Sequence, residues 1–430
     1  ADKVFIYPSV DLAWQFSKLN LFLGSPVLTF GKLRLAYGEV GVEPPPYNTQ
    51  SIYVSPNYSD SYGGSLSTDL FGAGSFTPSQ DLGDPNLSPE IKKEYEIGTD
   101  IRFFDNKVKI GYSYFYNTTD DVFFNLSLAN SSGYDEIFTN AGKIENKGME
   151  VDLGYDIFQT EDFKINLTAN WSYYRNKVLD LKGVESIRLG GLSAVSGRAV
   201  EGYPLGVFWG TKFSRNDDGS IFLNSNGFPT LAPENGVIGD PHPDWQGGVG
   251  TTVTWKNLNL YFLFETYQGA DIYAGTKAVL LNYGRHRDSG VETVAEKDLF
   301  DYNGGLITSG TSFRGTVHDF GAGDVALTES WYRGIGGYFS GVQEQFVEDG
   351  SWTRLREVTL SYSLRGPRFK KSTKLSSIDF SLTGRNLHIW TNFIGNDPDT
   401  NLTEVSTTRG IDYFNNPGTK SYVFKITLNY

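Results

Sequence analysis

Hydrophobic and polar residues alternate with a period of two along much of this chain, a pattern typical of strands with one apolar and one polar face. Between residues 94 and 103, one face carries Tyr95, Ile97, Thr99, Ile101 and Phe103, and the other carries Glu94, Glu96, Gly98, Asp100 and Arg102. The same alternation predicts about eleven strands, at 4–16, 31–40, 94–103, 108–116, 149–157, 163–171, 247–255, 258–267, 352–364, 376–390 and 419–430.

The connections between these strands are alternately short and long. Short turns are expected near 105–107, 158–162, 256–257 and 366–374, and long connections near 41–90, 178–246, 268–351 and 391–418. An all-β transmembrane barrel has this arrangement, with tight turns at one rim and large loops at the other. A soluble β-sandwich would show more even spacing between its turn signals.

The polar face carries too many charges for a dry core. Carboxylates and a guanidinium recur along it, at Glu94, Asp100, Arg102, Glu150 and Asp152. Burying such groups without partners is costly, so this face contacts bulk water or a hydrated lumen. The apolar face is then expected to contact lipid, with an aromatic girdle toward the strand ends at Trp171, Tyr173, Trp255 and Tyr430. A soluble sheet with one wet face is the alternative.

An odd number of strands does not close a bacterial single-chain barrel, and lipid does not tolerate an open sheet edge. The prediction of eleven strands therefore implies that further strands come from elsewhere.

Composition and charge exclude several classes of protein. The 430 residues include 30 Phe, 26 Tyr, 8 Trp and 49 Gly, which favours strands and tight turns. The absence of cysteine excludes disulfide scaffolds and Cys-ligated zinc. A net charge of −13 with no basic cluster argues against nucleic-acid binding. No apolar run approaches the roughly 18 residues of a membrane helix. No signal peptide is expected, because Ala1-Asp2-Lys3 leads directly into a strand-like segment.

Seven motifs, spread in order over the chain, resemble those of SusC/RagA-type TonB-dependent outer-membrane transporters. They are YPSVDLAW at 7–14, KLRLAYG at 32–38, SPEIKKEYEIG at 88–98, NAGKIENKGME at 140–150, GDPHPDW at 239–245, EDGSWTRLR at 348–356 and GRNLHIWTNFIGNDPD at 384–399. All of them resemble the C-terminal half of the family's barrel. The C-terminal strand also ends on an aromatic residue, Tyr430, as strands recognised by the barrel-insertion machinery do.

The resemblance implies that residues 1–430 are the C-terminal half of a 22-stranded plugged barrel. The plug, the TonB box and the first half of the barrel would lie outside this sequence. It also implies uptake of oligosaccharides or peptides across the outer membrane of a Gram-negative bacterium of the Bacteroidota type. The implied partners are a SusD-like surface lipoprotein, the TonB–ExbB–ExbD system, the N-terminal half of the barrel and outer-membrane lipid.

No catalytic, cofactor or metal site is predicted. The sequence has no G-x-S-x-G, Walker A or strand-linked GxGxxG motif. The four histidines, His242, His286, His318 and His388, lack metal-ligand spacing. The acidic clusters at 120–121, 216–219 and 397–399 are expected to be solvated turns, with calcium binding as the alternative for the last two.

The 268–351 connection carries aromatic residues around a glycine-rich stretch. Its candidates for contact with cargo, or for a lid over it, are Trp331, Tyr332, Tyr338 and Phe339. The same rings equally suit packing within the loop or against a partner protein. The sequence therefore predicts a nutrient importer rather than an enzyme. Two alternatives stay open, namely a soluble carbohydrate-binding or glycan-degrading protein and a passive barrel or adhesin.

Overall fold

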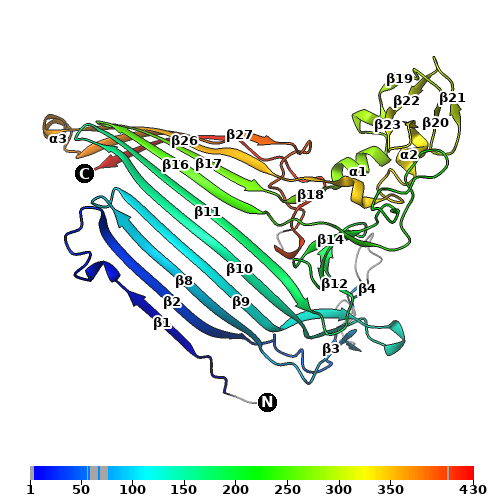
Figure 1. The fold of residues 1–430 in the computed structure, drawn as a ribbon, viewed down its shortest axis with the longest axis horizontal. Coiled ribbons are helices and arrows are strands. Elements are labelled where there is room, and N and C mark those ends of the chain that lie inside the picture. Colours follow the sequence, from blue (N-terminus) through cyan, green and yellow to red (C-terminus); the bar gives the residue numbers. More distant parts are fainter. Residues whose placement is uncertain (1–3, 56, 59–65, 68–75, 404–405) are drawn as a thin grey trace.

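Eleven long strands form one antiparallel sheet in which each strand pairs with the next along the chain, as the alternation predicts (Figure 1). The computed structural model describes residues 4–55, 57–58, 66–67, 76–403 and 406–430, so Ala1-Asp2-Lys3 lies outside the described residues. The strands are β1 (Ser9–Trp14), β2 (Leu28–Val42), β8 (Glu90–Phe103), β9 (Val108–Ser127), β10 (Glu136–Gln159), β11 (Phe163–Asp180), β16 (Trp245–Trp255), β17 (Leu258–Gln268), β26 (Trp352–Arg365), β27 (Ser377–Thr391) and β29 (Ser421–Asn429).

The connections confirm the predicted alternation. Tight connections join β8 to β9, β10 to β11, β16 to β17 and β26 to β27 at one end of the sheet, and the large connections lie at the other end (Figure 1). The tight turn after β8 has positive φ at Phe104, Asp105 and Asn106 (52°, 56° and 66°). Asp and Asn tolerate this left-handed region better than most residues do. The connection predicted as a turn at 366–374 contains a short helix, α3 (Pro367–Thr373), which begins on a proline.

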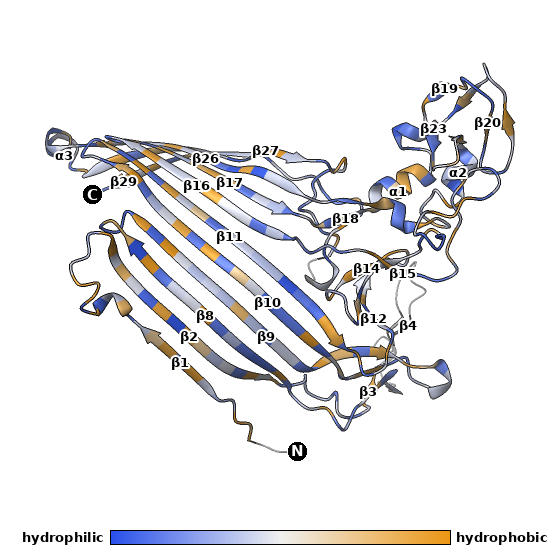
Figure 2. Ribbon diagram, in the orientation of Figure 1, coloured by the Kyte–Doolittle hydropathy of each residue, from blue (hydrophilic) through white to orange (hydrophobic). Residues whose placement is uncertain are grey.

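The two faces of the sheet differ as the sequence predicts. The pairing register aligns Lys32 with Asp100 and Leu35 with Ile97, so like faces meet across neighbouring strands. Along each of the strands β2, β8, β9 and β10, hydrophilic and hydrophobic residues alternate (Figure 2). The apolar side chains of one face are exposed in this chain, among them Val10, Leu12, Leu35, Ile97, Trp171, Trp255, Leu382, Phe424 and Ile426.

Three central strands are longer than predicted. β9, β10 and β11 have 20, 24 and 18 residues, whereas about 9–11 suffice to cross a bilayer. In their outer parts polar and apolar residues no longer alternate regularly, because apolar side chains such as Phe124, Ile144 and Val178 pack with loop residues in a second buried core. The period-two signal therefore ends before the strand does. The prediction of a solvated turn at Asp120–Asp121 is wrong for this reason, because both residues lie within β9. Asp121 has a positive φ of 57° and lies where the β9–β10 register shifts.

The long connections fold together into small sheets and helices at one end of the main sheet (Figure 1). The elements of the 178–246 connection are β12 (Ser186–Gly191), β13 (Ser196–Val200), β14 (Val207–Gly210) and β15 (Gly236–Gly239). The elements of the 268–351 connection are β18 (Asp271–Ala274), α1 (Gly275–Asn282), β19 (Glu292–Val294), β20 (Leu299–Phe300), β21 (Leu306–Ile307), β22 (Ser312–Arg314), β23 (Thr316–Asp319), β24 (Asp324–Leu327), α2 (Glu329–Arg333) and β25 (Val347–Asp349).

The remaining short strands belong to the first and last long connections. They are β3 (Tyr53–Val54), β4 (Asn57–Tyr58), β5 (Leu66–Ser67), β6 (Thr77–Pro78), β7 (Asp81–Leu82) and β28 (Ile411–Asp412). β7 extends the main sheet by pairing in parallel with β10, and β28 pairs in parallel with β18. No helix in the described part of the chain is long and apolar enough to cross a membrane.

One hydrophobic core joins the three later connections. Val195 and Phe208 come from the first of them, Tyr273 and Trp331 from the second, and Ile411 from the third, and all are buried in the same cluster. Because a loop rarely buries this much apolar surface, these connections form a folded module rather than independent loops. Within it, we call residues 271–349, the part from the second of these connections, the loop module. Its α1 and α2 stand out from the end of the sheet (Figure 1).

Candidate functional site

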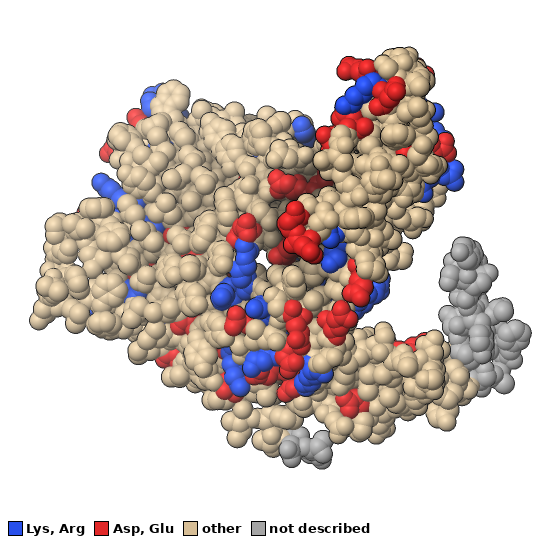
Figure 3. Space-filling view, turned by 45° about the vertical axis from the view of Figure 1, so that its right-hand side comes forward, with Lys and Arg blue, Asp and Glu red and all other residues tan. Residues whose placement is uncertain are grey.

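Charged side chains pair with each other on the polar face of β2 and β8. Lys32 Nζ lies 2.9 Å from Asp100 Oδ2, and Arg34 lies 3.5 Å from the same oxygen and 3.8 Å from Glu96 Oε1. These side chains are about a third exposed, so the pairs add little to stability. Their consequence is a hydrated surface on which acidic and basic groups lie side by side. Figure 3 shows that groups of both signs also gather around the hollowed centre of the molecule.

A cavity of about 650 Å³ opens on this polar face. Residues of seven consecutive strands line it, including Asp100, Asp152, Asn170 and Tyr261. Glycines at 111, 154, 248 and 250 leave room there, because they place no side chain on the face. The lining combines these carboxylates, an amide and a phenol with the cations Lys32, Arg102 and Lys109. It suits a polar solute that exchanges hydrogen bonds with the wall.

Farther toward the loop end, polar side chains form a row across four strands. Glu94, Asn117, Asn146 and Asn176 face one another in the pairing register. Asn117 donates to Glu94 (3.2 Å) and Asn146 donates to Asn117 (2.8 Å), while Asn176 accepts the Leu205 N–H (2.6 Å). This chain of hydrogen bonds ties the strand wall to the first folded loop and fixes its orientation.

The mouth of the polar face lies where β17, β26 and the loop before β29 meet. Tyr267 and Trp352 stack there with ring centroids 6.0 Å apart. The guanidinium groups of Arg354 and Arg356 lie 5.0 and 5.7 Å from the Trp352 ring, within the range of cation–π attraction. Two stacked rings and two guanidiniums therefore form one rigid group at the rim.

Arg354 holds the last long connection against this rim. Its Nη2 donates to Asp397 Oδ1 at 2.6 Å and lies 3.8 Å from Asp399 Oδ2. Both members of the Arg354–Asp397 pair are buried, with side-chain exposures of 6% and 10%. Arg356 binds Glu265 (2.5 Å) and lies 3.5 Å from Asp399. Burial raises the pKa of Asp399 above its ordinary value, although both arginines act to lower it.

These contacts bring together three motifs that are far apart in the sequence. A cavity of about 340 Å³ at the mouth is lined by residues of the 239–245, 348–356 and 384–399 segments and of the loop that follows, including Pro241, Trp352, Asp399 and Asn401. Asp271 also lines it and accepts the Asp240 N–H at 2.7 Å. Burial is the main cause that raises the pKa of Asp271, and the nearby carboxylates of Asp240, Asp349 and Asp244 raise it further.

We expect Asp271→Asn to stabilise the base of the loop module at neutral pH. Because the folded pKa is raised, the proton on Asp271 contributes stability below the ordinary Asp value of about 3.9, and this contribution is lost as the pH rises through the folded pKa. Compared with the wild type, the neutral variant should gain amide-exchange protection in β18 at neutral pH. Near pH 4 it should gain little protection.

The control for this prediction is Asp349→Asn, since Asp349 is the register partner of Asp271. Hydrogen bonding by Ser351 lowers the pKa of Asp349. Its ionised form therefore contributes stability that is present above the ordinary pKa and lost on acidification, the opposite dependence. Equal protection in the two variants at both pH values would contradict the assignment.

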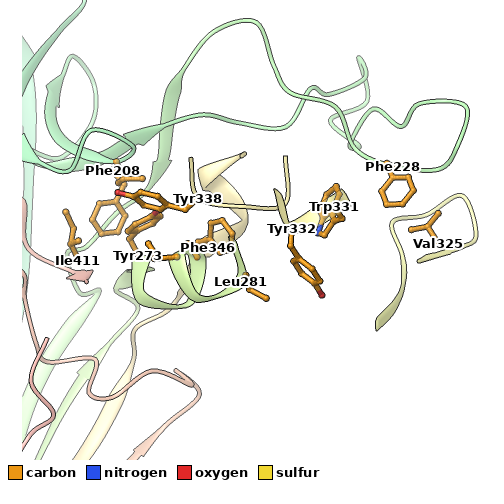
Figure 4. Close-up of a cluster of buried hydrophobic side chains, with 13 residues drawn as sticks. Phe208, Phe228, Tyr273, Leu281, Val325, Trp331, Tyr332, Tyr338, Phe346 and Ile411 are labelled. Carbon is orange, nitrogen blue, oxygen red and sulfur yellow. The ribbon is translucent and has the colours of Figure 1, made fainter. Parts of the chain in front are cut away.

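The four aromatic residues predicted for the cargo or lid lie in the loop module but in different environments. Trp331, Tyr332 and Tyr338 are buried in its core, where Trp331 contacts Phe228 and Tyr338 lies beside the Phe208–Tyr273 end (Figure 4). Burial raises the pKa of Tyr338 to about 12. Three of the rings therefore serve packing of the loop in this conformation, one of the roles that the sequence left open.

Phe339 differs from the other three aromatic residues because 63% of it is exposed. Its ring meets Tyr283 edge to face with centroids 5.9 Å apart, and Tyr283 is also exposed. Tyr283, but not Phe339, lines a cavity of about 400 Å³ together with Arg314, Tyr332 and Arg333. Contact of these aromatic residues with cargo stays a prediction.

Several residues of the mouth were not singled out from the sequence. They were placed in predicted strands or in a family motif but were given no role; they are Tyr267, Trp352, Arg354 and Arg356. The available signal for three of them was the pair of family motifs, since 348–356 contains Trp352, Arg354 and Arg356 and 384–399 contains Asp397 and Asp399. Nothing in either motif alone shows that Arg354 meets Asp397.

The candidate cation-binding segments make other contacts. Asp397 and Asp399 face the guanidiniums of Arg354 and Arg356, while Asp218 accepts from Ser220 at 2.6 Å. His242 lies 2.7 Å from Asp240. Within the ranges that the structure describes, no three His, Asp or Glu side chains gather as a metal site would require.

Family comparison agrees with this arrangement of strands and loops. The family described as "TonB dependent receptor-like, beta-barrel" matches residues 2–387. The chain therefore belongs to the family of TonB-dependent receptor β-barrels, which are outer-membrane proteins of Gram-negative bacteria and are transporters rather than enzymes. The alternative of a soluble carbohydrate-binding or glycan-degrading protein is wrong on this ground.

Individual relatives are distant but extensive. TonB-dependent receptor P3 of Formosa agariphila is 24% identical over 100% of this chain and 42% of its own length. SusC of Bacteroides thetaiotaomicron is 23% identical over 84% of this chain and 34% of its own length. The structure of the RagAB peptide transporter aligns with a TM-score of 0.70 at 20% identity over 98% of this chain and 43% of that chain. This chain spans about two fifths of the length of the P3 receptor.

Proposed function

We propose that this chain forms the wall and outer loops of a TonB-dependent outer-membrane importer of the SusC/RagA type, which takes up oligosaccharides or peptides. One observation carries the proposal: an antiparallel sheet presents a charged, hydrated face on one side, an apolar face on the other and folded loops at one end. The polar face lines the passage, and the loop end receives cargo from outside.

We propose further that residues 1–430 constitute the C-terminal half of the barrel. Among the described strands, β1 and β29 each pair on one side only, with β2 and β27. An open backbone edge is costly in lipid, so both edges need further strands. The N-terminal half of the barrel would supply them, and the plug and TonB box would precede it.

The partner that we propose at the loop end is a SusD-like surface lipoprotein. The support is the likeness of this fold to the RagAB peptide transporter and the exposed aromatic pair of Tyr283 and Phe339 on the loop module. The TonB–ExbB–ExbD system would act from the opposite side through the plug. No covalent chemistry is needed, and cargo passage is gated by the loops and the plug.

Trp331, Tyr332, Tyr338 and Phe339 take different parts in this proposal. Phe339, with Tyr283, offers a ring face to a sugar or a peptide side chain. Trp331, Tyr332 and Tyr338 hold the loop module in the shape that presents Phe339. Their direct contact with cargo would require the module to open.

The test uses the full-length gene in its own host. We expect its deletion to abolish uptake of one labelled class, oligosaccharides or peptides, and the intact gene to restore it. Collapse of the proton gradient or loss of TonB should stop the restored uptake, and the tagged protein should co-purify a surface lipoprotein. Uptake that survives loss of TonB would favour the passive barrel instead, and uptake unchanged by deletion would contradict the proposal.

A further inference from the structure

Two neighbouring rows of side chains mark the loop-side boundary of the apolar face. The pairing register aligns Val10, Tyr37, Tyr95, Tyr116, Lys147 and Arg175 across six strands. The next row toward the loops aligns Glu39, Lys93, Thr118, Glu145 and Lys177. The row on the other side, Leu35, Ile97, Tyr114, Met149 and Tyr173, contains no charge. Charges therefore begin at one level of the wall, beside a belt of tyrosines.

Three cations cluster on β10 and β11 at this level, and we call Lys147, Arg175 and Lys177 the outer basic patch. Lys147 lies directly opposite Arg175 in the register, and Lys177 is diagonal to Lys147. Like charges opposite each other across strands are destabilising, and diagonal side chains lie about 7–8 Å apart. Lys147 and Lys177 are both exposed. An anion between the two strands would relieve this repulsion.

The nearby carboxylates are already engaged by other groups. Glu145 is the register partner of Lys177, but its carboxylate accepts from Tyr116 Oη at 2.9 Å and forms no ion pair with Lys177. Asp244 pairs with Arg175. Asp120 lies 2.9 Å from Lys143 and 3.4 Å from Lys93. Within the described residues, Lys147 and Lys177 have neither an ion pair nor a side-chain hydrogen bond. Two cations are therefore free on a face whose neighbouring row is apolar.

We propose that the outer basic patch binds the phosphate groups of an acylated, phosphorylated glycolipid of the outer leaflet. The inference rests on the outer-membrane location and not on the identity of the cargo. Long loops mark the extracellular side of an outer-membrane barrel, so the patch lies at the level of the outer headgroups. Met149, Tyr173 and Trp171 lie directly below it on the same face, where acyl chains would pack. The phosphates then bridge Lys147 and Lys177 above them.

The sequence hid this patch because each cation stands alone between polar or apolar neighbours. Lys147 and Lys177 are 30 positions apart, and only the β10–β11 pairing brings them together. Their alternation with Asn146 and Asn176, which point to the polar face, gives the segment the appearance of a solvated strand. The absence of a basic run in the sequence therefore did not exclude a basic patch on the surface.

The experiment measures binding of labelled lipid A to the full-length protein purified in detergent. We expect the double variant Lys147→Gln/Lys177→Gln to raise Kd by about 10- to 30-fold, since each cation near an anionic lipid surface contributes roughly a tenfold factor at most. The matched control, Lys107→Gln/Lys256→Gln, removes the same charge at the tight-turn end and should leave Kd unchanged. Dephosphorylated lipid A should bind the wild type as weakly as intact lipid A binds the double variant.

The outcomes separate a lipid headgroup from other sources of phosphate. Competition by inorganic phosphate at the concentration of the lipid would overturn the assignment to a lipid. Equal Kd values for the two double variants would overturn the assignment to this patch. Normal heat-modified migration of both variants on gels confirms that each is folded, so a loss of binding by misfolding is recognised.

Discussion

Replacing Arg354 with methionine is expected to release the 391–418 connection from the barrel wall. The variant leaves the buried Asp397 carboxylate without its cation, and breaking a buried ion pair by removing one partner costs about 3–5 kcal/mol. Asp399 also loses one of its two guanidinium neighbours. We expect amide hydrogen exchange in 391–418 to rise steeply, while strands distant from this rim, such as β8 and β9, keep their protection.

The control for this substitution is Arg385→Met on the neighbouring strand. Arg385 pairs with Glu357 at 3.1 Å but is 58% exposed, so its loss should cost less than about 1 kcal/mol. The double variant Arg354→Met/Asp397→Leu removes both charges, and it should recover much of the protection, since an apolar pair replaces a buried ion pair with little cost. Unchanged exchange in 391–418 for the single variant would show that Arg354 does not hold this connection.

The strands of the wall were predictable from the sequence, and their outer ends were not. Alternation between Tyr95 or Ile97 and Glu94 or Glu96 requires only local information, because a strand with one lipid face and one wet face imposes a period of two. Above the membrane one face packs against the folded loops, where Phe124, Ile144 and Val178 are buried, so the regular alternation ends although the backbone pairing continues. β10 begins at Glu136, well before the predicted start at 149, for this reason.

The mouth of the passage was only partly predictable. The family motifs marked 239–245, 348–356 and 384–399 as segments of interest, but the contact of Arg354 with Asp397 joins residues 43 positions apart. Sequence spacing across a long connection says nothing about which side chains meet. The outer basic patch has the same origin, since its lysines come together only through strand pairing.

The roles of the loop aromatics could not be separated from the sequence either. Trp331 and Phe339 stand in the same glycine-rich stretch, and neither flanking pattern shows which ring faces inward. Burial follows from packing against Phe228, Tyr302 and Phe320, which come from other parts of the chain. The distinction between packing and cargo contact therefore became testable only with the structure.

Trp331→Ala is expected to unfold much of the loop module. Trp331 is 2% exposed, and its ring contacts Phe228, Tyr302 and Phe320 with centroids 5.3–5.7 Å apart. Truncating a buried tryptophan to alanine costs about 3–5 kcal/mol, since both transfer energy and a cavity are involved. The core around Trp331 also holds Ala278, Val279 and Leu281 of α1 and Tyr332 of α2. The helices α1 and α2 should therefore lose amide protection and become sensitive to protease while the barrel strands stay intact.

Phe339→Ala is the matched control in the same stretch. Because its ring is largely exposed, the variant should keep the module folded and protease-resistant. If Phe339 contacts cargo as proposed, uptake should weaken in this variant although the fold is unchanged, whereas Trp331→Ala should lose both together. A folded Trp331→Ala module with weakened uptake would instead show that Trp331 acts on cargo directly, and would reverse the division of roles drawn from its burial.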